Sequence, residues 1–538
     1  MSETPRRNFL KVAGAAVVAA ALGVIGYKVA KKPSPTPAPT TQPPSTTAAP
    51  TTAPPPKEKV LIFGLKEDIV TLDPAMHRKR VTESVIQQYA EPLFWRTNDM
   101  RVIPHLLESY EFVDDLTWRL KLRKGIKFHD GTELKAEDVK FTLERILDPN
   151  QNSPRASMID EIDTITIIDD YTLEIKTKYP SGPLMVDLTY QEILPKHAVE
   201  AQGEDFFKNP FSTGPFKFVE WVPGERIVFE KNPDYWGGPA EVPPVGPPKV
   251  DKLIFKVIPD SATRMQALKA GEIHISYGFT ADQAEEMAKD PNLVVEKVRA
   301  ARSVFVFLNT HKAPFNDKRV RHALNMAVDV DAIIKNVLKG YGRRIACMSF
   351  PGVLGHDPNL EPFPYDPDRA RQLLAEAGYP DGFDAVMMYD EEWRKDQAEA
   401  IAYYLGQVGV NVTIQLMDWG TIKNEYLLKA KGDMYFGSWG CGELELYGNV
   451  NSTFAREKDT YAFQYHNDEV TRLMKEALAT LDPEQRAQKF MELERILQED
   501  APAIWLWEQF DPWVYRKEVT FTPRTDERYN LVDADISV

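Results

Sequence analysis

The stretch SVFVFLNTHKAPFNDKRVRHALNMAV, from Ser303 to Val328, decides how the rest of this chain is organised. Val304–Leu308 is a short apolar run rich in β-branched and aromatic residues. It is too short for a helix, so it predicts a strand that is buried on both faces. Pro314–Asp317 then turns the chain into a helix whose apolar residues recur at helical spacing: Val320, Leu324 and Val328. On pattern alone, this is a core strand that leads into a helix.

A second informative stretch runs from Trp118 to Leu147. Apolar and basic residues alternate over Trp118–Arg123, which is the period of a half-buried strand. A turn follows at His129–Thr132, and Ala136–Asp138 then places two acids in the first turn of a predicted helix. His129 and Asp130 are neighbours in that turn, and we interpret them as turn residues rather than as a catalytic pair.

Both stretches resemble sequence markers of the extracytoplasmic solute-binding proteins of ABC importers, in the subfamily that includes dipeptide- and oligopeptide-binding proteins. Further markers occur along nearly the whole chain: Thr71–Ala75, Ile193–His197, Ser212–Phe218, Tyr365–Ala370 and Leu373–Tyr379. The resemblance implies an α/β, two-lobed periplasmic-binding-protein-like fold (type II, cluster C) with an inserted third domain. It also implies that the strand at 304–308 crosses from the first lobe to the second, with the ligand in the cleft between them.

The domain limits that we predict follow from this crossing. Lobe I takes residues 57–98, 208–304 and 503–538, the inserted domain takes residues 99–207, and lobe II takes residues 305–502. A chain of 538 residues is too long for a single core, which agrees with two or three domains.

Residues 1–32 are predicted to be an export signal or membrane anchor. Arg6-Arg7 and the following Phe9–Lys11 resemble a twin-arginine signal. The apolar stretch Val12–Val29 reaches the roughly 17-residue lower bound of a spanning helix, so we expect it to be retained, although the sequence leaves cleavage open. Residues 33–56 form a Pro/Thr-rich stalk, which holds a tethered domain outside the cell, on its surface or in the periplasm.

The charge of the chain bears on its partners. Residues 1–56 hold six lysines and arginines and one acid, which leaves a net charge of −20 for residues 57–538. This acidic balance argues against nucleic acid as a partner. Cys347 and Cys441 are the only cysteines, and the sequence does not decide whether they pair.

The sequence lacks the common enzyme motifs. The sequence has no Gly-x-Ser-x-Gly, His-Glu-x-x-His, phosphate-loop or dinucleotide-binding pattern, and its nine histidines show no metal-ligand spacing. We therefore expect no enzyme activity, no cofactor and no metal. The alternative is a secreted hydrolase that acts on peptides or glycosides.

The candidate ligand-binding residues come from the resemblance. The loop after the first marker follows the cleft in the family, which suggests His77, Arg78 and Arg80. The family's peptide binders hold the ligand's amino terminus with an aspartate a few residues after a tryptophan. Here that segment supplies Trp439, Cys441, Gly442 and Glu443. Gly442 falls where the aspartate is expected, so the anchor is either lost or shifted to Glu443.

Loss of that anchor keeps a second ligand class open. Some members of the subfamily bind oligosaccharides by stacking sugar rings on aromatic side chains. Six tryptophans are candidates for this, of which Trp419 and Trp439 are chosen as site residues: Trp393, Trp419, Trp439, Trp505, Trp507 and Trp513. The predicted function is therefore capture of an oligopeptide or an oligosaccharide by hinge closure, followed by delivery to the ABC permease subunits in the membrane.

Overall fold

The computed structural model describes residues 57–239, 246–455 and 460–537. Residues 57–538 form one compact unit. The predicted export signal and stalk lie outside the described residues. Within the described residues, no helix is both long enough and apolar enough to cross a bilayer.

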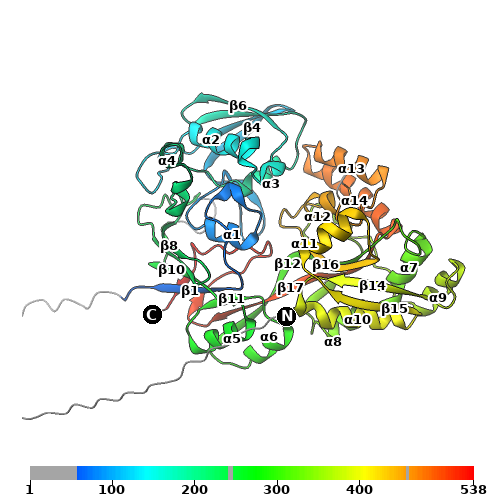
Figure 1. Cartoon of the computed structure of the whole chain (residues 1–538). Coiled ribbons are helices and arrows are strands. Elements are labelled where there is room, and N and C mark those ends of the chain that lie inside the picture. The colour runs from blue at the N-terminus through cyan, green and yellow to red at the C-terminus, as the bar shows by residue number, and fades with distance from the viewer. Residues whose placement is uncertain (1–56, 240–245, 456–459, 538) are drawn as a thin grey trace, which may run out of the picture. The chain divides into compact units, whose positions relative to one another are not determined.

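Two long antiparallel strands run through the molecule and join its two lobes. They are β12 (Leu293–Leu308) and β17 (Ala503–Arg516), which pair from Leu293 opposite Arg516 to Phe307 opposite Ala503 (Figure 1). The strand expected at 304–308 is confirmed as the second part of β12. It is buried on both faces because alternate residues enter two different cores, with Val304, Val306 and Leu308 in one and Phe305 and Phe307 in the other.

The pairing of β12 with β17 is interrupted in the middle. The register shifts between Arg299 and Ser303, and Ala301 there has a left-handed backbone with φ of 43°. Before this bulge β12 pairs with the second half of β17, and after it β12 pairs with the first half. β12 begins at Leu293, earlier than the apolar run predicts. Its first part contains charged residues that break the apolar pattern, and pairing with β17 keeps this part in the strand.

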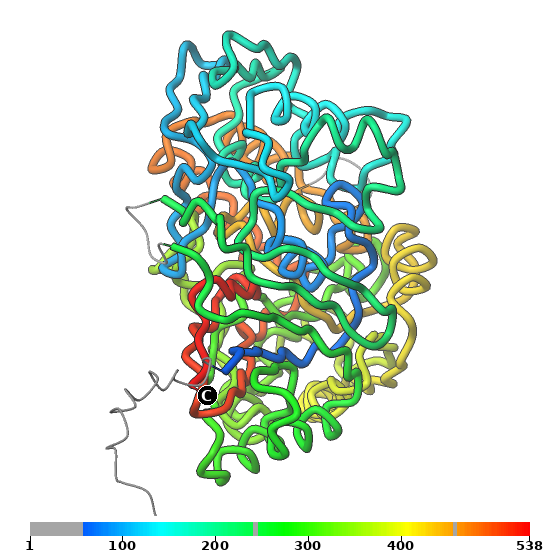
Figure 2. Tube along the Cα trace, turned by 90° about the vertical axis from the view of Figure 1, so that its left-hand side faces the viewer, coloured from blue at the N-terminus to red at the C-terminus, as the bar shows by residue number. Residues whose placement is uncertain are grey.

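Lobe I is the part of the large sheet with the strand order β17-β11-β1-β10-β9-β8. The strands are β1 (Val60–Leu65), β8 (Phe216–Val222), β9 (Arg226–Lys231), β10 (Lys252–Val257) and β11 (Ile275–Tyr277), and the helices are α1 (Arg80–Ile86), α5 (Ser261–Ala270) and α6 (Ala281–Met287). The C-terminal segment lies beside β1 (Figure 2), where the Lys59 ammonium is 2.6 Å from the Asp535 carboxylate.

Lobe II is the other end of the same sheet, in the order β15-β14-β16-β12-β17. Its strands are β14 (Phe383–Tyr389), β15 (Val410–Leu416) and β16 (Met434–Gly440), and β13 (Gly342–Arg344) adds to β17. Its longer helices are α7 (Lys318–Ala327), α9 (Pro367–Glu376), α10 (Lys395–Gly406), α13 (Asp468–Leu478) and α14 (Pro483–Asp500). The helix predicted after Pro314–Asp317 is α7, capped by the Asp317 carboxylate.

A separate four-stranded sheet carries the second sequence marker. It has the order β4-β5-β7-β6, made of β4 (Leu107–Asp114), β5 (Thr117–Leu122), β7 (Thr172–Thr177) and β6 (Ile162–Asp169). Helix α2 (Ala136–Leu147) packs with it around a core of its own. This unit also contacts lobe II, where the Gly182 N–H donates to the Leu478 carbonyl at 2.9 Å. The exact limits 57–98, 99–207, 208–304, 305–502 and 503–538 stay a prediction.

Candidate ligand-binding site

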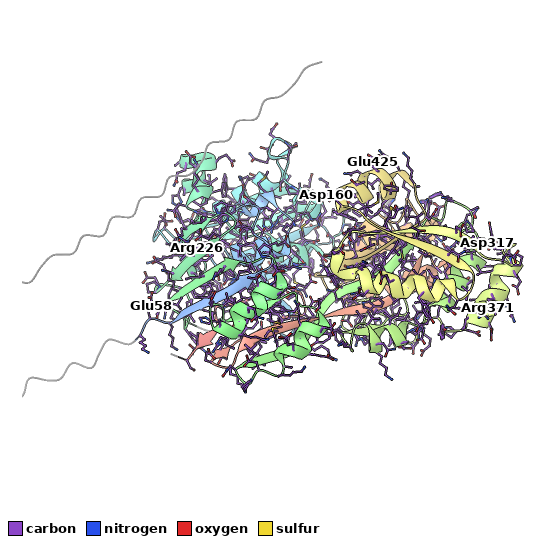
Figure 3. The ribbon with its side chains drawn as sticks, turned by 60° about the horizontal axis from the view of Figure 1, so that its bottom comes forward. Glu58, Asp160, Arg226, Asp317, Arg371 and Glu425 are labelled. Atoms are coloured by element: carbon purple, nitrogen blue, oxygen red, sulfur yellow. The ribbon has the colours of Figure 1, made fainter. Side chains whose placement is uncertain are left out.

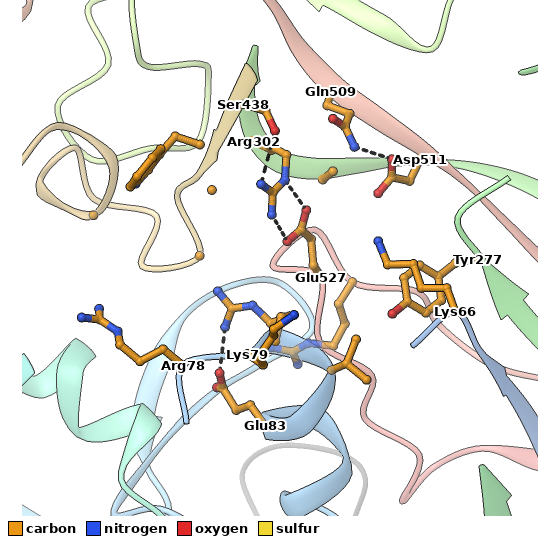
Figure 4. A pocket seen from close by; sticks show the side chains of 18 of the residues that line it. Lys66, Arg78, Lys79, Glu83, Tyr277, Arg302, Ser438, Gln509, Asp511 and Glu527 are labelled. Atoms are coloured by element: carbon orange, nitrogen blue, oxygen red, sulfur yellow. Dashed lines mark hydrogen bonds and ion pairs between the residues drawn. The ribbon is translucent and has the colours of Figure 1, made fainter. Parts of the chain in front are cut away.

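A cavity of about 440 Å³ lies between the two lobes, beside the bulge of β12. Lobe I contributes the end of β1, the loop before α1 and the C-terminal segment, and lobe II contributes the end of β16 with the loop that follows it. Arg302 lines the cavity from the bulge, and Asp511 lines it from β17 (Figure 4). The cavity is therefore lined by both lobes and by the two strands that join them.

Charged side chains of both signs dominate the lining. The cations are Lys66, Arg78, Lys79, Arg80, Arg155, Arg299, Arg302, Arg394 and Arg524. The acids are Glu67, Glu83, Glu391, Glu443, Asp511 and Glu527. Such a lining suits a small polar ligand with charged groups of its own.

An ion pair crosses the floor of the cavity. Arg302 donates from Nε and Nη2 to the two carboxylate oxygens of Glu527, both at 2.9 Å (Figure 4). Glu527 stands in the C-terminal segment with a left-handed φ of 61°, and Arg302 also reaches the Ser438 hydroxyl at 3.4 Å. This bidentate pair fixes the C-terminal segment of lobe I to the bulge between the lobes.

Arg394 fixes the lobe II wall in a similar way. Its Nε donates to Glu391 at 2.6 Å, and its Nη2 donates to the Ser438 hydroxyl at 2.8 Å and to Gln509 at 3.2 Å. The guanidinium lies 4.2 Å from the ring centre of Trp393, which is 48% exposed and lines the cavity. An aromatic face is thus available to a ligand on this wall.

Four charged groups of the lining have no ion-pair partner within the described part of the chain. Glu443 makes no side-chain hydrogen bond there either, and Asp511 accepts only from the Gln509 amide at 2.8 Å. Lys66 lies 5.6 Å from the ring centre of Tyr277, and Arg78 reaches only the Ser157 hydroxyl at 3.3 Å. Burial, and then the nearby Glu527 carboxylate, raise the pKa of Asp511. Two acids and two cations are therefore available to a ligand.

The structure brings five of the eight candidate residues to this cavity. They are Arg78, Arg80, Trp439, Gly442 and Glu443. Arg80 pairs with Glu83 at 3.1 Å and lies 5.5 Å from the ring centre of Tyr190. All five candidates line the same cavity, and their contact with a ligand stays a prediction.

The other three candidates do not line that cavity. His77 is 2% exposed, and its Nε2 accepts from Arg155 at 2.9 Å. Cys441 is buried, and its thiol donates to the Glu445 carbonyl at 3.2 Å; Cys347 is buried too, and both thiols are free. Trp419 packs against Trp439, with the ring centres 6.0 Å apart.

Gly442 has a steric role at the cavity wall. A Cβ atom there would stand 2.0 Å from the Nη2 atom of Arg80. The space that an aspartate side chain would need at this position is therefore taken by a guanidinium. The nearest acid that remains on this wall is Glu443.

Sequence reasoning missed several lining residues, and some of them had a local signal. Arg302 and Asp511 are charged residues inside the two crossing strands, where a long apolar strand is interrupted. Lys66 directly follows β1, whose apolar residues are a local strand signal. Glu527 gave no signal, because it reaches the site only through the folding of the C-terminal segment.

We expect the free energy of unfolding to fall as pH decreases from 6.5 to 4, in part because of His77. Burial, together with the nearby Arg155 cation, lowers the pKa of His77 from 6.5 to about 2. The unfolded chain therefore binds a proton that the folded chain does not, and stability that is present above pH 6.5 is lost as pH falls. His77→Gln keeps an acceptor for Arg155 and should reduce this slope by about 1.4 kcal/mol per pH unit.

Urea denaturation at pH 7, 6, 5 and 4 measures that slope. The matched control is His466→Gln, because His466 is exposed and pairs with the exposed Asp468. Equal slopes for the wild type and His77→Gln would contradict a buried neutral His77.

The family comparison gives a match over most of the chain. The model for the bacterial extracellular solute-binding proteins, family 5, matches residues 101–462. The glutathione-binding protein GsiB of Pectobacterium atrosepticum is 28% identical over 498 residues, which cover 89% of this chain and 94% of that protein. GsiB of Salmonella typhimurium is also 28% identical, over 493 residues with the same coverage.

Solved structures agree with this match. The periplasmic binding protein DppA from Helicobacter pylori, in complex with the peptide STSA, has a TM-score of 0.75 at 27% identity, covering 89% of this chain and 98% of that one. The oligopeptide-binding protein AppA from Bacillus subtilis, in complex with a nonapeptide, has a TM-score of 0.74 at 25% identity, covering 89% and 100%. CtaP from Listeria monocytogenes has a TM-score of 0.80 at 23% identity, which shows the shared fold.

Proposed function

Since the chain belongs to the bacterial extracellular solute-binding proteins of family 5, we propose that it captures a short peptide between its two lobes and delivers it to an ABC importer. The family is extracytoplasmic, and its solved relatives are binding proteins rather than enzymes. A receptor role is therefore favoured over the hydrolase alternative.

The observation that carries the ligand class is the set of unpaired charges in the cavity. A short peptide presents an ammonium and a carboxylate at once, and the cavity offers Glu443 and Asp511 for the first and Lys66 and Arg78 for the second. A neutral oligosaccharide would leave the two half-buried carboxylates, Glu443 and Asp511, without a cationic partner. The relatives named above for peptides and for glutathione support the same class.

Closure of the lobes is the proposed mechanism. The bulge at 299–303 is the place where β12 and β17 lose their regular pairing, so it is the natural hinge between the two halves of the sheet. A ligand that contacts both walls favours the closed arrangement by its differential affinity for it. The membrane permease then recognises the closed form.

We also propose that the N-terminal segment tethers the protein outside the cytoplasm. The support is the twin-arginine pattern, the apolar stretch Val12–Val29 and the Pro/Thr-rich tract that follows. The limits of lobe I, the inserted domain and lobe II that the sequence predicts are a further part of what we propose.

A ligand screen tests the proposed function. We expect di- and tripeptides at 100 times their Kd to raise the free energy of unfolding by about 2.7 kcal/mol in thermal-shift assays. The same peptides should compact the protein in solution scattering and should be recovered uncleaved. Stabilisation by malto- or cello-oligosaccharides and by no peptide would replace the peptide proposal, and product formation would favour the hydrolase alternative.

A further inference from the structure

A second cavity, of about 200 Å³, opens beside the first one and is built largely by the inserted sheet unit. The two share Arg78, Met158, Glu443 and Gly448 in their linings, so they are adjacent and separated only by these side chains. Asp160, Glu161, Ser181 and Asp187 line the second cavity from residues 99–207, and Tyr447 and Asn451 line it from lobe II. Asp160 lies where these two parts of the chain meet (Figure 3).

Asp187 is the central group of this second cavity. Asp187 is only 5% exposed, and its Oδ1 accepts a hydrogen bond from the Tyr447 hydroxyl at 3.0 Å. Its other carboxylate oxygen, Oδ2, has no hydrogen-bond partner in the described part of the chain, and the residue lines the cavity. A carboxylate that is buried in this way is costly unless a donor or a cation meets it.

The neighbours of Asp187 increase this cost. Glu161 is 6% exposed and accepts from the Ser181 hydroxyl at 2.9 Å, and Glu443 stands at the junction with the first cavity. Burial, and then the charges of Glu161 and Glu443, raise the pKa of Asp187 well above its usual range. The cavity thus gathers these three acidic groups in a place that water reaches only in part, and a cation bound among them would favour the charged form of Asp187.

The one cation that lines the second cavity within the described residues is Arg78, at its mouth. Arg78 is exposed, lines both cavities and, among the described residues, bonds only the Ser157 hydroxyl. Lys178 is near Glu161, but its ammonium donates to the backbone carbonyl of Asp160. Neither cation pairs with Asp187.

We propose that this second cavity is a subsite for a cationic group of the bound peptide, an ammonium or guanidinium held by Asp187 and Glu161. The inference rests on the proposed function and deepens it, because it gives the inserted unit a direct role in ligand choice. The cationic group enters past Glu443 while the rest of the peptide lies in the first cavity, where Lys66 and Arg78 meet its carboxylate. The source of the cation is either a lysine or arginine side chain or the terminal ammonium.

Isothermal titration calorimetry with matched tripeptides tests the subsite on the full-length protein. The probes are alanine tripeptides with lysine, or its uncharged analogue norleucine, at each of the three positions, with and without N-acetylation. At one position we expect lysine to bind at least about tenfold more tightly than norleucine. If the terminal ammonium is the group bound, acetylation instead costs at least about tenfold.

Two variants assign the effect to the subsite. Asp187→Asn, alone or with Glu161→Gln, keeps an acceptor for Tyr447 and should reduce the lysine or ammonium preference to within about twofold, while the affinity for N-acetylated norleucine peptides, which carry no cation, stays unchanged. Ser181→Ala removes a hydrogen bond from Glu161 without removing charge, and it should retain the preference. Thermal melting of each variant verifies folding.

The outcomes separate this inference from the function on which it rests. Peptides that bind with no preference for lysine and no effect of acetylation overturn the subsite and leave the peptide function standing. A preference that persists unchanged in the Asp187→Asn and Glu161→Gln double variant also overturns it. Failure of every peptide to bind overturns the proposed function, and the subsite with it.

Discussion

Replacing Arg155 with methionine is expected to lower the free energy of unfolding by about 3–5 kcal/mol, the usual cost of removing one partner of a buried ion pair. Arg155 is 1% exposed and donates to the Glu192 carboxylate at 2.7 Å, to the His77 carbonyl at 3.1 Å and to the Tyr190 carbonyl. It thus fixes the loop that carries Arg78 and Arg80 to the cavity.

The loss comes from the carboxylate that is left behind. Glu192 is fully buried, and without Arg155 its remaining side-chain donor is the Gln87 amide at 3.0 Å. Burial already raises the pKa of Glu192 to about 7 with Arg155 in place, so the variant should take up a proton at this site. The double variant Arg155→Met with Glu192→Gln should recover part of the stability, because no unpaired charge remains.

Equilibrium denaturation in urea measures both variants. The control is Arg472→Met on the exposed face of α13, where the arginine pairs with Glu469 and Glu476 and each such pair contributes less than about 1 kcal/mol. A loss below about 1 kcal/mol for Arg155→Met would show that Arg155 does not support the loop in this way.

Glu443→Gln is expected to weaken peptide binding by about 2–5 kcal/mol, because it removes the charge that meets a buried ammonium. Glu443 borders both cavities and has no ion-pair partner in the described part of the chain. N-acetylation of a peptide whose amino terminus lies there should cost a similar amount. Glu425→Gln, which changes an exposed pair with Lys429 on lobe II, should leave affinity unchanged.

Trp439→Ala separates the two ligand classes in the same titrations. If an oligosaccharide stacks on this wall, the substitution should cost about 1–3 kcal/mol of binding while Glu443→Gln costs little. Full retention of peptide affinity in Glu443→Gln, together with a loss in Trp439→Ala, would therefore contradict the ammonium anchor.

The sequence by itself determined the elements whose signals are local. The run Val304–Leu308, the helix after Asp317 and the alternation over Trp118–Arg123 each depend on side chains a few residues apart. Periodicity and turn chemistry therefore sufficed to place them, and the markers along the chain gave the family. The candidates Arg78, Arg80 and Glu443 came from the resemblance to the family at two other short stretches of the chain.

Only the tertiary structure decided which side chains share the cavity. Arg302 and Glu527 are 225 residues apart in the chain, and they meet because the C-terminal segment folds back onto the bulge. His77 and Cys441 stand next to residues that line the cavity but point into the interior, where Arg155 and the Glu445 carbonyl satisfy them. Asp187 accepts a hydrogen bond from Tyr447 only because the inserted unit packs against lobe II. The direction of a side chain and its partners depend on how lobes and inserted unit pack, and this packing leaves no periodic trace in the sequence.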